Sequence, residues 1–118
     1  MTIESDIYDT LKGLVGNRVF PDVAPFSTTR PYITYQQVGG TPIHYIDPTL
    51  ADKKHGLFQI NVWAETRSQA ASLALQVEAA FIAATAYQAR PAGGLVAQHE
   101  PDLNLYGTMQ DFDVWSTR

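Results

Sequence analysis

The strongest constraint on the fold is a change of periodicity in the middle of the chain. Residues 57–65 read LFQINVWAE, with apolar side chains at alternate positions, which is typical of a strand with one buried face. Thr66 and Gln69 follow at the spacing of a capping box, in which each side chain satisfies a backbone N–H at the start of a helix. The sequence therefore predicts a strand over 57–65 that leads directly into a helix over 67–85.

This second helix is rich in alanine and poor in charge. Its buried stripe is expected to comprise Ala70, Leu73, Ala74, Val77, Ala80, Phe81 and Ala84, widened by Leu75 and Ile82. Glu78 is the only charged residue from Ser68 to Ala89. A helix with so few charges is expected to be covered on more than one side. The sequence leaves open whether the second cover is its own sheet or another subunit.

The same two kinds of periodicity predict the remaining elements. Residues 3–15 carry an apolar stripe at helical spacing and end at a Gly-Asn stop signal. Residues 32–38 are rich in β-branched and aromatic residues, residues 108–116 alternate, and residues 95–100 are a further candidate strand. This order predicts a single domain, 1–118, of the α+β class. We expect a small, mostly antiparallel sheet with two helices packed on one face.

Three stretches between these elements are irregular. Residues 18–36, RVFPDVAPFSTTRPYITYQ, contain three prolines, which fix φ and make a rigid, extended lead-in to a strand. Residues 40–55 are predicted to form a long loop or an irregular hairpin tip. Residues 90–94, RPAGG, are predicted to be a break between elements.

Composition narrows the classes of function. The net charge is −4 and the eight basic residues are scattered, so we expect no sequence-specific nucleic-acid binding, although a mildly acidic channel would let DNA slide through. The absence of cysteine excludes a disulfide or a thiolate metal site. Gln76 and Glu78 interrupt the most apolar stretch, and no signal-peptide pattern is present. We therefore expect no membrane association and a cytoplasmic location.

Residue types that carry chemistry do not form a recognisable catalytic or metal-binding pattern. Four residues of the predicted loop could in principle gather a metal ion: His44, Asp47, Asp52 and His55. Their spacing matches no metal-site pattern. His99 stands beside Glu100 without a nucleophile partner, and Asp111 and Asp113 are explained more simply as a solvated strand face. We therefore expect no enzyme activity, no cofactor and no tightly bound metal.

Two tryptophans stand out because each falls on the polar face of its strand. If the two strands are neighbours, Trp63 and Trp115 share that face with Gln59, Asn61, Asp111 and Asp113. Tryptophan is enriched at interface hot spots. The sequence leaves open whether another subunit or a segment of the same chain covers the two indoles.

The order of these features resembles the tail-completion proteins, or tail terminators, of long-tailed bacteriophages and prophages. The resemblance covers nearly the whole chain and is most specific in RVFPDVAP, in RPYITYQ and in VWAETRSQA, and the chain closes with QDFDVW. None of these segments is a catalytic motif. The likeness is loosest over residues 42–56 and 87–106.

The resemblance implies a non-enzymatic virion protein that assembles as a ring, commonly of six subunits. Such a ring caps the tail tube, stops its growth and offers a surface to the head. The implied partners are further copies of the chain, the tail tube protein and the head–tail connector. The implied locations are the virion tail and, during assembly, the host cytoplasm.

Candidate interface residues follow from these arguments. They are Trp63 and Trp115 together with four apolar residues of the predicted loop: Ile43, Tyr45, Ile46 and Leu50. We expect residues 40–55 to be mobile in the free subunit and to become ordered in the assembly, because a lone surface loop has no reason to keep four apolar side chains.

Three rival interpretations remain at this stage. One is a head–tail connector or another ring-forming or tube-forming tail subunit of the same virion. The second is a small ligand-binding or hydrolytic domain, which would need a pocket with a perturbed acid or base. The third is a cytoplasmic domain with no role in assembly.

Overall fold

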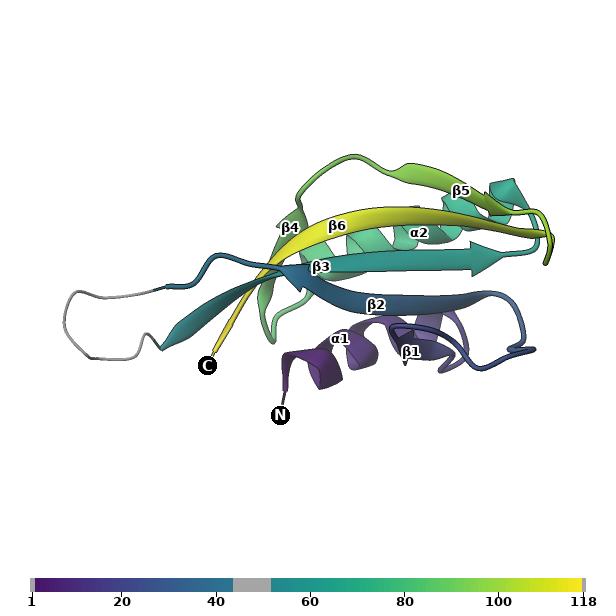
Figure 1. Cartoon of the computed structure of the whole chain (residues 1–118). Coiled ribbons are helices and arrows are strands. Elements are labelled where there is room, and N and C mark those ends of the chain that lie inside the picture. The colour runs from purple at the N-terminus through teal and green to yellow at the C-terminus, as the bar shows by residue number, and fades with distance from the viewer. Residues whose placement is uncertain (1, 44–51, 118) are drawn as a thin grey trace.

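Capping and periodicity produce the elements in the order that the sequence predicts. The computed structural model describes residues 2–43 and 52–117. The elements are α1 (Ile3–Leu11), the 3₁₀ turn η1 (Lys12–Leu14), β1 (Val19–Pro21), β2 (Tyr32–Gly39), β3 (Lys53–Ala64), α2 (Arg67–Ala83), β4 (Gln88–Pro91), β5 (Val96–Glu100) and β6 (Leu105–Thr117) (Figure 1). At the start of α2 the Thr66 hydroxyl accepts the Gln69 N–H at 3.1 Å. The Gln69 side chain in turn accepts the Glu65 N–H at 3.3 Å.

The strands form one mixed sheet, in which β3 is the central strand and β6 lies next to it. The strand order is β1-β2-β3-β6-β4, and β5 also pairs with β6. Only the β1–β2 pairing is parallel, and every other pairing is antiparallel. Because β3 occupies one edge of β6 over almost its whole length, β4 and β5 share the other edge, one at each end.

Both helices cover one face of this sheet, which we call the inner face. The helices lie behind the strands in Figure 1. Alternate side chains of β3 and β6 point inward, where they are buried against α1 and α2. The largest fully buried side chains are Phe58, Phe81, Phe112, Ile7, Leu11, Ile33 and Ile60. Phe81 of α2 stacks on Phe112 of β6 with ring centroids 4.6 Å apart. The expected α+β class, with a mostly antiparallel sheet and two helices on one face, is confirmed.

A buried tyrosine links α1 to the segment that follows α2. The Tyr87 hydroxyl and the Thr10 hydroxyl lie 2.7 Å apart and share a hydrogen bond. The Tyr87 ring packs edge-on against Phe81. Burial raises the pKa of the Tyr87 phenol to about 12, although the hydrogen bond to Thr10 acts in the opposite direction.

Two stretches predicted to be irregular are strands instead. Residues 53–55 belong to β3, which continues to pair with β6 as far as Lys53 opposite Thr117. Residues 88–91 form β4 along the opposite edge of β6, which corrects the predicted break at its start. In both places a partner distant in sequence imposes the strand, and local composition does not report it. Pro91 is tolerated because it ends an edge strand.

The helix ends also differ from the prediction. The α-helical part of the first helix stops at Leu11, and the chain tightens into η1 before the predicted end at residue 15. The second helix stops at Ala83 because Ala84 adopts an extended conformation. Among the described residues, no helix is long and apolar enough to cross a membrane.

Candidate functional site

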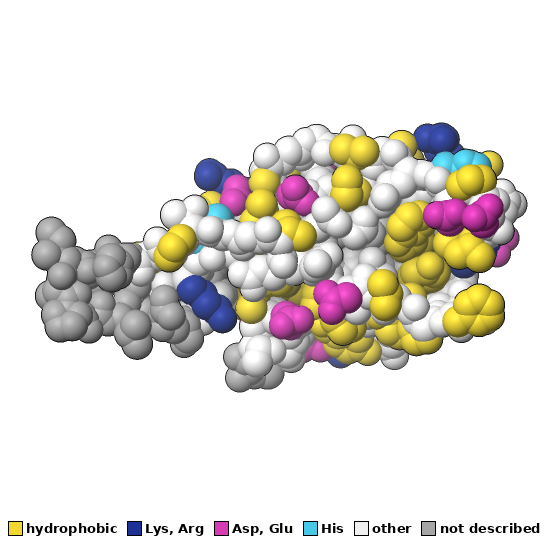
Figure 2. Space-filling model, viewed as in Figure 1, with side chains coloured by type: hydrophobic (Ala, Val, Ile, Leu, Met, Phe, Trp, Pro, Cys, Tyr) yellow, Lys and Arg dark blue, Asp and Glu magenta, His cyan; other side chains and the backbone are white. Residues whose placement is uncertain are grey.

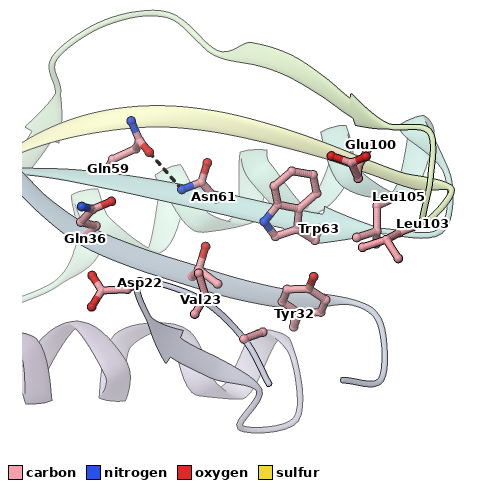
Figure 3. Close-up of a pocket in the computed structure, with 12 residues that line it drawn as sticks. Asp22, Val23, Tyr32, Gln36, Gln59, Asn61, Trp63, Glu100, Leu103 and Leu105 are labelled. Carbon is pink, nitrogen blue, oxygen red and sulfur yellow. Dashed lines mark hydrogen bonds between the residues drawn. The ribbon is translucent and has the colours of Figure 1, made fainter. Parts of the chain in front are cut away.

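The outer face of the sheet, opposite the helices, contains a groove at the end where β2 begins and β3 ends. Two adjoining hollows of about 390 and 360 Å³ share Ala24, Tyr32, Leu103 and Leu105 in their walls. Strands β2 and β3 form the floor, the proline lead-in forms one side, and the turn between β5 and β6 forms the other (Figure 3). We call this feature the outer groove.

Hydrogen bonds to backbone carbonyls hold the two walls of the outer groove in place. The Arg30 guanidinium donates to the Leu103 carbonyl at 2.7 Å and to the Asn104 carbonyl at 3.3 Å. The Asp22 N–H donates to the Tyr35 carbonyl at 2.9 Å and extends the contact between the lead-in and β2. Proline fixes φ at positions 21, 25 and 31, which reduces the entropy that the lead-in loses when it is held in this way. The groove is therefore built into the subunit.

Trp63 forms part of the floor of the outer groove. Its indole lies against the backbone of Gly107, its partner on β6, so closely that a Cβ at position 107 would stand 2.6 Å from the Trp63 Cε3 atom. The indole is half-buried by its own chain and also lines the groove (Figure 3). The expectation that Trp63 shares the outer face with Gln59 and Asn61 holds.

Three large apolar side chains are exposed on the rim of the outer groove, while most of its floor is polar. Phe26 is 93% exposed, Val23 is 78% exposed and Leu103 is 52% exposed. Figure 2 shows hydrophobic side chains gathered at this end of the outer face, to the right of the view. A lone subunit gains nothing from such exposure, and a concentrated apolar patch marks an interaction site.

Trp115 lies at the opposite end of the outer face, within a cluster of its own chain. Its ring packs at a tilt of 37° against His55, with 4.7 Å between centroids, and the Arg90 guanidinium lies 5.0 Å from its centre. The His55 Nδ1 atom accepts the Thr41 N–H at 2.8 Å. The other ring nitrogen, Nε2, therefore donates to Asp113 Oδ1 at 2.7 Å.

The two tryptophans thus lie on neighbouring strands and on the same face, but far apart. His55, the β3 partner of Trp115, is eight positions from Trp63, which corresponds to about 27 Å along a strand. They occupy two ends of the outer face and form no single aromatic cluster.

A second uncovered apolar surface runs along α2 on the side that faces away from the sheet. We call it the α2 stripe; it consists of Ala71, Leu75, Ala79 and Ile82. Leu75 is 64% exposed and Ile82 is 62% exposed, so the prediction that they widen the buried stripe is wrong. The low charge of the helix was the signal that could have identified this surface from the sequence.

The structure describes only some of the remaining candidate residues. Within residues 2–43 and 52–117, no three His, Asp or Glu side chains gather as metal ligands. His99 stacks on Tyr106 at 4.4 Å. Ile43 is half-buried, while five of the residues considered lie outside the described residues: His44, Tyr45, Ile46, Asp47 and Leu50. The expected ordering of the 40–55 segment therefore stays a prediction.

Comparisons with known proteins bear on this arrangement. A solved structure with 15% sequence identity superposes with a TM-score of 0.56, over 98% of this chain and 90% of its own, which shows a shared fold. No curated protein matches the sequence significantly. The family model for the tail completion protein gp17 matches residues 8–116. The chain therefore belongs to the tail completion protein gp17 family and is a structural component of a bacteriophage tail.

Proposed function

We propose that the protein is a non-enzymatic cap of the phage tail tube. Copies assemble as a ring, commonly of six subunits, that seats on the end of the finished tube and stops its growth. The exposed side of the ring then offers a surface for joining to the head. The partners are the tail tube protein and the head–tail connector, and assembly takes place in the host cytoplasm.

The observation that carries this proposal is the presence of exposed apolar side chains on two different surfaces, at opposite sides of one subunit. The outer groove opens on the outer face of the sheet, while the α2 stripe lies beyond the inner face. A two-fold dimer needs only one self-complementary surface. A ring needs two unlike surfaces on each subunit, because its contacts run head to tail.

The net charge and the hydrogen bonds of two polar side chains support the same proposal. The net charge of −4 favours a ring through which DNA passes without adhering. His55 and Asp113, which could serve acid–base chemistry, are occupied by each other and by the Thr41 backbone. The polar residues that the described structure brings together therefore suit a structural role.

The test combines the purified protein with tail tubes assembled from the tube protein. Light scattering gives the mass of the free and tube-bound protein, and negative-stain microscopy locates it on the tubes. We expect ring-shaped density at one end of each tube, and we expect capped tubes not to lengthen when more tube protein is added. An Ile82→Asp variant, which places a charge in the α2 stripe, is the matched control and should leave tubes growing.

Two outcomes would overturn the proposal. If the protein binds isolated head connectors but leaves tube growth unchanged, it is a connector. If the protein stays monomeric at all concentrations in the presence of tubes, the proposal that it assembles as a ring is wrong.

A further inference from the structure

We propose that the α2 stripe of one subunit seats in the outer groove of its neighbour. This inference rests on the proposed ring and specifies which two surfaces meet. It assigns the occupant of the groove to a second copy of this chain, through a helix whose exposed apolar side meets the apolar side chains on the groove rim.

The dimensions of the two surfaces agree. Along β2 the groove floor runs from Tyr32 to Gln36, four residues or about 13 Å of strand. On α2, Leu75 and Ile82 are seven residues apart, or about 10 Å along the helix axis. The two large side chains of the stripe therefore fit within the length of the groove, where the exposed Phe26, Val23 and Leu103 side chains would meet them.

The charges of the two surfaces are compatible. Arg30 is the one basic residue in the groove walls. Beside the α2 stripe lie Glu78, the single acidic residue of α2, and Arg67, one turn before Ala71. Asp22 and Glu100 also line the groove, and they disfavour a partner that carries several carboxylates. A helix with a single acidic side chain, which can approach Arg30, meets this requirement.

Topology makes the occupant another copy. The groove and the α2 stripe are separated by the sheet, so a subunit cannot fill its own groove. Each subunit carries one groove and one stripe. A closed ring of head-to-tail contacts therefore fills every groove and covers every stripe, and leaves neither surface exposed.

The experiment uses the fact that the chain contains no cysteine. Leu75→Cys marks the stripe and Leu103→Cys marks the groove; both side chains are more than half exposed, so folding should be retained, which circular dichroism verifies. Each single variant, the mixture of the two, and the double variant are oxidised under assembly conditions and separated by denaturing electrophoresis. The double variant Glu4→Cys with Leu103→Cys is the control, since Glu4 is exposed on α1, outside both surfaces.

We expect no product from either single variant and a dimer only from their mixture. The Leu75→Cys, Leu103→Cys double variant should give a ladder that ends at the number of subunits in the ring, and the control should lose that ladder. Dimers formed by Leu75→Cys alone would overturn the inference, because they would show that two α2 stripes pack on each other. Rings that cap tubes but give no ladder would also overturn it, and would leave the proposed function standing. A ladder in a protein that fails to cap tubes would support the contact and refute the function.

Discussion

Two neighbouring residues on α2 separate folding from assembly. Phe81 is fully buried against Phe112, whereas Ile82 is 62% exposed in the α2 stripe. The substitutions Phe81→Ala and Ile82→Ala therefore remove one side chain from the buried part and one from the exposed part of the same helix turn. We predict opposite effects: the first destabilises the subunit, and the second weakens the ring.

The structure sets the size of each effect. Removing a buried phenylalanine costs about 3–5 kcal/mol, which is a large part of the roughly 5–15 kcal/mol that holds a domain together. The Ile82→Ala change should alter the free energy of unfolding by no more than about 0.5 kcal/mol, since the side chain is exposed and alanine favours a helix. Covering an isoleucine that is 62% exposed is worth about 1–2 kcal/mol per contact, or roughly a 5- to 30-fold weakening. That loss recurs at every contact of a closed ring.

Urea denaturation measures the first effect and light scattering measures the second. Phe81→Ala should lower the denaturation midpoint sharply. Ile82→Ala should unfold at the midpoint of the natural sequence yet require a much higher concentration to form rings. If Ile82→Ala assembles as the natural sequence does, the α2 stripe is not an interface. If it unfolds as easily as Phe81→Ala, the assignment of the exposed side of α2 is wrong.

Three further predictions test the core and the two tryptophans. Burial raises the pKa of the Tyr87 phenol to about 12, so the phenol of the unfolded chain ionises at lower pH than that of the folded chain. The contribution of the neutral phenol to stability is therefore complete below pH 10 and is lost as pH rises toward 12. Measured by urea denaturation on either side of pH 10, Tyr87→Phe should lose less stability than the natural sequence. Gly107→Ala should cost about 1–3 kcal/mol in urea denaturation, because its Cβ meets the Trp63 ring and the Val62 carbonyl at 2.6 Å, while Gly94→Ala, with open space around it, should be neutral. Trp115→Ala should lower the melting temperature and leave rings intact, whereas Trp63→Ala should weaken rings in size-exclusion chromatography.

Each of these has a result that contradicts it. If Tyr87→Phe loses as much stability above pH 10 as the natural sequence does, a group other than the Tyr87 phenol causes the loss. Equal denaturation midpoints for Gly107→Ala and Gly94→Ala would contradict the close contact with Trp63. Loss of rings in a fully stable Trp115→Ala protein would make Trp115 an interface residue.

The fold was largely predictable because its main signals are local. The capping box at Thr66 and the alternation through β3 depend on neighbouring residues, and both lie where the sequence places them. The strand residues 53–55 and 88–91 were missed because their pairing with β6 depends on residues far away in the chain. Local composition, with lysines in one case and proline and glycine in the other, indicates a loop.

The candidate site was predictable only in part. Trp63 was found because an indole on a polar strand face is unusual. The outer groove was not, since its walls come from the lead-in and from the β5–β6 turn, which the Arg30 hydrogen bonds bring together across more than seventy residues. Leu75 and Ile82 were assigned to the core because helical spacing alone cannot say where a wide apolar stripe stops being covered.

The position of β6 between β3 on one side and β4 and β5 on the other has a consequence for how the chain folds. Strand β3 gains its partner on that side only when residues 105–117 are available, and neither β4 nor β5 has any partner in the sheet before then. During synthesis, the backbone N–H and C=O groups along one edge of β3 therefore stay unpaired until β6 is complete, and such an edge can pair with another chain. Contacts between residues so distant in sequence also form slowly. At high expression, we expect incomplete chains to be recruited into aggregates, and synthesis at low temperature should raise the yield of soluble protein.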